Sequence, residues 1–89
     1  MEATDEWYAE GRYYALTVFS EVSKRDGLGV ELEDVAPAPG RGLAMVIFRD
    51  DSTGIPVVST TTYLAVPGEV VTRFTEYALR RLLPEDVPE

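Results

Sequence analysis

A continuous apolar run near the middle of the chain does most to limit the folds open to it. The run is Leu43-Ala44-Met45-Val46-Ile47-Phe48. It is too short for an ordinary buried helix, and its length and composition are typical of a central β-strand. The preceding segment, residues 36–42, is rich in proline and glycine, which favour neither a strand nor a helix. We therefore expect a sheet built around residues 43–48.

The segment before that loop predicts a second strand. Residues 28–35 alternate, with Val30 and Leu32 on one side and Glu31 and Glu33 on the other. Such alternation is the pattern of a half-buried strand.

The segment after the apolar run predicts a third strand. Residues 55–66 are β-branched and rich in threonine, and Pro56 lies near the start, where a strand tolerates it. Residues 50–54, Asp-Asp-Ser-Thr-Gly, have the chemistry and length of a hairpin connection.

Helical spacing predicts a helix before these strands, over about residues 5–26. Thr4 or Asp5 would cap its start, and Gly27 would follow its end. Gly11 would then lie inside the helix at a cost of about 1 kcal/mol, which close packing would explain. The predicted stripe of apolar or small residues is Trp7, Tyr8, Gly11, Tyr14, Ala15, Val18, Phe19 and Val22.

A second helix is predicted after the strands, over about residues 68–83, and Pro84 would stop it. Its predicted buried stripe is Val70, Val71, Phe74, Tyr77, Ala78 and Leu82. The expected order is helix, strand, strand, strand, helix in one domain over residues 1–89, with residues 1–4 and 84–89 frayed. The predicted fold is α+β, an antiparallel three-stranded sheet with two helices packed on one face.

The 89-residue chain contains no histidine and no cysteine, which removes Ser–His and Cys–His catalysis and nitrogen- or sulfur-based zinc and copper sites. Lys24, the only lysine, is expected at a solvated helix end, unsuited to Schiff-base chemistry. Glu31 and Glu33 are spaced like paired catalytic carboxylates but are expected on a solvated face. We interpret residues 50–54 as a polar turn rather than a cation site. We expect no enzyme, no catalytic residue, no cofactor and no metal.

Sixteen acidic and eight basic residues give a formal charge of −8. This charge disfavours direct nucleic-acid binding and suits a basic protein partner, although it also fits simple solubility. No apolar run approaches the roughly 18 residues that a membrane span needs. The acidic N-terminal segment is unlike a signal peptide, so we expect a cytoplasmic protein.

The apolar run leaves a surface to be explained. Leu43, Met45 and Ile47 alternate with residues that are also apolar, so one set should lie on the uncovered face of the sheet. That face would bind a second copy or another protein, or else the long loop or the tail covers it. Tyr13 and Leu16 lie off the main stripe of the first predicted helix, and Glu31, Glu33 and Asp34 add acidic charge. The predicted partner-binding residues are Tyr13, Leu16, Glu31, Glu33, Asp34, Leu43, Met45 and Ile47.

Three functional hypotheses follow, in order of preference. The first is a small acidic, non-catalytic binding protein, such as an immunity protein for a toxic nuclease or a phage-encoded inhibitor of a nucleic-acid enzyme. The second is a homo-oligomeric structural or accessory protein, with a homodimer formed through the open sheet face. The third is a small enzyme that uses only carboxylates, tyrosine and arginine.

Overall fold

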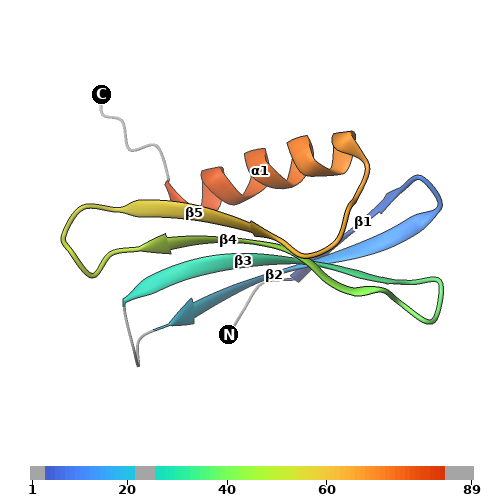
Figure 1. Ribbon diagram of the computed structural model, residues 1–89, viewed down its shortest axis with the longest axis horizontal. Helices are drawn as coiled ribbons and strands as arrows, with labels where there is room; N and C mark the ends of the chain where they lie inside the picture. The colour runs from blue at the N-terminus through green and yellow to red at the C-terminus, as the bar shows by residue number, and fades with distance from the viewer. Residues whose placement is uncertain (1–3, 22–25, 84–89) are drawn as a thin grey trace.

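The computed structural model describes residues 4–21 and 26–83, and its sheet has five strands rather than the predicted three. All neighbouring strands are antiparallel and follow chain order, β1-β2-β3-β4-β5. Figure 1 shows a twisted sheet with the single described helix lying across one face. The elements are β1 (Thr4–Ala9), β2 (Arg12–Glu21), β3 (Gly27–Ala36), β4 (Gly42–Asp50), β5 (Val57–Thr62) and α1 (Gly68–Leu82).

The predicted first helix is wrong, because residues 4–21 form the β1–β2 hairpin. Ala9 pairs with Arg12, which leaves Glu10 and Gly11 as a two-residue turn. Both turn residues have positive φ, 51° and 83°, as a type I′ turn requires, and glycine suits the second position. Gly11 is therefore a turn residue and not a packing residue inside a helix.

Helix-like spacing arose here because apolar side chains occupy both faces of the hairpin. Tyr14 and Leu16 are buried on the face that α1 covers, and Trp7 meets Tyr77 of α1 edge to face at 5.6 Å. Phe19 lies on the opposite face, where the period of two places it. Aromatic and β-branched residues also favour strands intrinsically.

The residues predicted to cap the first helix lie in strands instead. Thr4 and Asp5 lie in β1, and Gly27 begins β3, so none of them caps a helix. Lys24 lies outside the described residues. So do the predicted frayed ends, except that Thr4 begins β1.

The remaining predicted elements are confirmed with shifted bounds. The strands predicted at 28–35 and 43–48 are β3 and β4, and the helix predicted at 68–83 is α1. The strand predicted at 55–66 is shorter, since β5 ends at Thr62. The polar turn after β4 is also observed: the Asp50 side chain accepts hydrogen bonds from the backbone N–H and hydroxyl of Ser52 at 2.9 and 2.7 Å.

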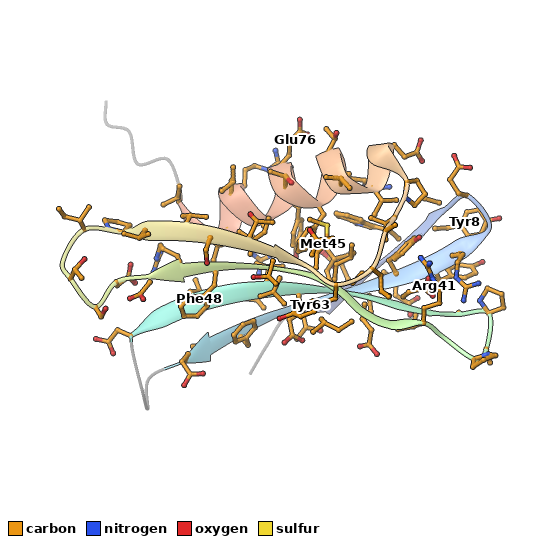
Figure 2. The ribbon with its side chains drawn as sticks, in the orientation of Figure 1. Tyr8, Arg41, Met45, Phe48, Tyr63 and Glu76 are labelled. Atoms are coloured by element: carbon orange, nitrogen blue, oxygen red, sulfur yellow. The ribbon has the colours of Figure 1, made fainter. Side chains whose placement is uncertain are left out.

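The core lies between the sheet and α1. Figure 2 shows Met45 in this layer, below the helix, whereas Glu76 projects from the outer side of α1. The helix contributes Val70, Phe74, Ala78 and Leu82 at a spacing of four residues, which forms one helical face. The sheet contributes Ala9, Tyr14, Leu16, Val30, Leu32, Ala44, Met45 and Ile47.

Candidate functional site

The structure buries four of the predicted partner-binding residues. Leu16, Met45 and Ile47 lie under α1 in the core, and Asp34 is also fully buried. Of the two apolar sets in β4, the helix therefore covers Met45 and Ile47, and Val46 and Phe48 face the other side. The side chains of these four predicted residues stabilise the fold and are inaccessible on the surface of one copy.

Asp34 sits at the centre of an ion cluster. Its carboxylate accepts hydrogen bonds from Arg12 Nε at 2.9 Å and from Arg41 Nε at 2.8 Å. The other ends of both guanidinium groups bind backbone carbonyls, Arg12 that of Pro37 and Arg41 that of Ala65. The cluster joins the β1–β2 hairpin, the β3–β4 loop and the segment between β5 and α1.

Two opposing effects act on the Asp34 carboxyl group. Burial alone would raise its pKa, but the hydrogen bonds from Arg41 and Arg12 outweigh burial and hold the pKa below its ordinary value. Asp34 therefore stays ionised, and both arginines are occupied by it. We interpret this cluster as a structural device, because its polar groups are satisfied by one another.

The opposite face of the sheet carries stacked aromatic rings. Phe19 and Phe48 lie 6.1 Å apart, with an angle of 22° between their ring planes. They flank Gly29, which pairs with both. A Cβ atom built on Gly29 would lie 2.3 Å from the Phe19 ring, and one on Gly27 would lie 2.1 Å from the Phe48 ring. Because Gly27 and Gly29 carry no side chain, both rings lie flat against β3.

Carboxylates lie on this same face. Glu6, Ala15 and Glu33 pair across β1, β2 and β3 in one row, which places the two acids about 10 Å apart, two strand spacings. Glu31 lies two residues before Glu33 on the same side of β3, about 7 Å away. We call Glu6, Glu31, Glu33, Phe19 and Phe48 the acidic aromatic face, in which Phe19 is half-buried and Phe48 is buried, at 6% exposure.

Exposed apolar residues border the acidic aromatic face. Tyr8 and Tyr13 pair across the hairpin, with ring centroids 4.8 Å apart. Leu43, opposite Glu33, and Tyr63, after β5, are also exposed. Figure 2 shows Phe48 and Tyr63 on the side of the sheet away from α1, and Tyr8 at the hairpin end. Thus Tyr13, Glu31, Glu33 and Leu43 are the predicted binding residues that share this face.

The arginines of the described strands lie on the helix side of the sheet, and others lie on α1. Arg12 and Arg49 point to the helix side of the sheet, where Arg49 donates to the carbonyl of Leu82 and pairs with Asp51 at 2.9 Å. On α1, Arg73 stacks over Trp7 at 4.3 Å. Among residues 4–21 and 26–83, no strand residue facing away from α1 is basic. The basic side chains of the described strands are therefore segregated to the helix side, whereas acidic side chains lie on both faces, with Asp5 and Asp34 on the helix side.

Sequence reasoning missed this segregation, because it placed Phe19 in a helix and never considered Glu6 as part of a strand. The hairpin sequence Glu10-Gly11 between two aromatic-rich segments was the signal that could have shown it.

Within the described part of the chain, no group of three acidic side chains is placed to hold a metal ion. The described helix is too short and too polar to cross a bilayer. Comparisons with protein-family models, curated proteins and solved structures give no match to this chain. The acidic aromatic face is therefore the feature of the structure that bears on function.

Proposed function

We propose that this protein is a non-catalytic binding module that docks a basic protein through the acidic aromatic face. The observation that carries the proposal is that Glu6, Glu31 and Glu33 share one face with the stacked rings, while the basic residues of the described strands face the other side. The exposed rings of Tyr8 and Tyr13 and the half-buried ring of Phe19 supply the aromatic contact area that protein interfaces use. Complementary charge speeds and orients association. The partner class that fits best is a cationic protein, such as an enzyme that handles nucleic acid, which this module would inhibit.

The same charges disfavour the alternative of a homodimer through this face. Two copies placed face to face would bring Glu31 and Glu33 toward the same carboxylates of the other copy. Like charges in close opposition are destabilising. A foreign cationic surface meets no such penalty.

Charge reversal tests the proposal. The purified protein would be immobilised and exposed to native-host extract, with Glu31→Lys/Glu33→Lys compared against Glu69→Lys/Glu76→Lys on the exposed side of α1. Both double variants change net charge equally. We expect a basic protein to be retained by the wild type and the helix variant, and its affinity for the face variant to fall about tenfold or more.

Salt provides a second readout for the recovered partner. Affinity should fall as ionic strength rises, because exposed charges are screened. Equal retention by both double variants, together with affinity that stays flat from low to high salt, would refute docking on this face. Thermal unfolding of each variant checks that the lysine substitutions leave the fold intact.

A further inference from the structure

The outer edge of β5 is a second interaction surface, and its chemistry differs from that of the acidic aromatic face. β5 is the last strand of the sheet, and within residues 26–83 no other segment pairs with its outer side. Its sequence, Val-Val-Ser-Thr-Thr-Thr, contains no charge, proline or glycine. Proteins ordinarily blunt exposed edges with charges, proline or bulges, because unpaired backbone groups recruit other strands.

The other edge of the sheet is protected by comparison. β1 carries Asp5 and Glu6 and has no uncharged run longer than three residues. A strand approaching β1 would have to accommodate these carboxylates. Association by strand pairing is therefore directed to β5.

The hydrogen-bond pattern fixes which groups of β5 point outward. Tyr63 donates its backbone N–H to the carbonyl of Ala44 at 2.7 Å. Inward and outward groups alternate along an antiparallel strand, so Val58, Thr60 and Thr62 present their N–H and C=O groups at the free edge.

We propose that β5 pairs antiparallel with β5 of a second copy, across a two-fold axis at Thr60. In this register Val58 pairs with Thr62 of the second copy, and about six backbone hydrogen bonds form. Paired residues share a face, so Val57 meets Tyr63 of the second copy. These side chains are 55% and 58% exposed in one copy, and the pairing covers both.

Self-complementarity identifies the occupant as a second copy. The strand is neutral, so the high net negative charge of the chain places no like charges along the shared edge. A two-fold interface also closes on itself, and protected β1 edges would end the joined sheet on both sides. The expected product is a dimer with a continuous sheet and both acidic aromatic faces on the same side, independent of whether those faces bind a partner.

Substitution at the axis tests the pairing in the full-length protein. Thr60 is exposed, and a charge there would face its own copy across the axis. We expect wild type to have the mass of a dimer by sedimentation and light scattering at micromolar concentration. Thr60→Lys and Thr60→Glu should each halve that mass, and an equimolar mixture of the two should restore it. Thr72→Lys, on the exposed side of α1, is the matched control and should stay dimeric.

The possible contradictions are distinct. A wild type that is monomeric at high micromolar concentration overturns the proposal, as does a dimer that survives both Thr60 substitutions. Loss of the dimer in Glu31→Lys/Glu33→Lys alone would move the interface to the open face. If a Thr60 variant fails to fold, amide hydrogen exchange of the wild type tests the pairing instead. The exchange rates of the Thr60 and Thr62 N–H groups must then fall as the protein concentration rises. Partner retention in the charge-reversal experiment is scored separately.

Discussion

At the residue scale, Asp34 shows how completely surroundings define a side chain. The sequence places it after Glu31 and Glu33, and it resembles one more surface acid. In the fold its side chain has no exposed area, and two arginines hold it. Its neighbour Glu33 is exposed on the opposite face.

Asp34→Asn should destabilise the protein by about 1.5–3 kcal/mol near neutral pH, because charge-assisted hydrogen bonds are lost. The folded-state pKa of Asp34 is lowered, so its stabilising contribution is complete above the unfolded pKa of about 3.9 and is lost as pH falls toward the folded pKa. Urea unfolding measures the difference in free energy of unfolding between the wild type and Asp34→Asn, and this difference should shrink below about pH 4. If the difference in stability stays the same in acid, the charge of the Asp34 carboxylate is not its cause. Glu33→Gln is the control, expected within about 0.5 kcal/mol of wild type.

At the scale of elements, the β1–β2 hairpin is the main departure from the predicted fold. Its turn requires positive φ at both Glu10 and Gly11. Its strands place aromatic residues on both faces, so the alternation of buried and exposed residues is not visible as alternation of apolar and polar types. Helical spacing fits such a segment by chance. The antiparallel pairing of residues 4–9 with residues 12–17 resolves the ambiguity.

Gly11→Ala distinguishes the two folds by the sign of its effect. In a helix the change would stabilise by about 1 kcal/mol. At a φ of 83° it should instead cost about 1 kcal/mol, because the left-handed region strains a residue with a Cβ atom. Equilibrium unfolding measures the difference. Glu10→Asn supplies the companion variant, and it should stabilise the turn, since Asn-Gly is favoured there.

At the scale of the whole molecule, one helix covers one face of the sheet and leaves the acidic aromatic face opposite it. Stability is therefore concentrated in a single layer, where α1 packs on the central strands. Phe19, expected to lie in the core as part of a helix, is half-buried on the face away from α1. Phe19→Ala should therefore lower the free energy of unfolding by less than the same substitution of a core phenylalanine.

Phe74→Ala should destabilise by about 3–5 kcal/mol, because the Phe74 side chain is wholly buried between α1 and the sheet. Domains are commonly stable by only about 5–15 kcal/mol, so this variant should lose a large share of its stability in urea. Leu79→Ala, on a partly exposed position of the same helix, is the control and should cost much less. Equal effects of the two substitutions would contradict the placement of the core.

The sequence by itself determined β3, β4, most of β5, α1 and the polar turn after Asp50. In those segments the local pattern is unambiguous: alternation, a short apolar run, or a stripe at helical spacing ended by Pro84. It also determined the acidic charge and the absence of histidine and cysteine. Only the tertiary structure decided that residues 4–21 are a hairpin and that Met45, rather than Val46, faces the helix. It alone paired Asp34 with Arg12 and Arg41. The physical reason is that each of these outcomes depends on which face of the sheet α1 covers, and residues distant in sequence make that choice.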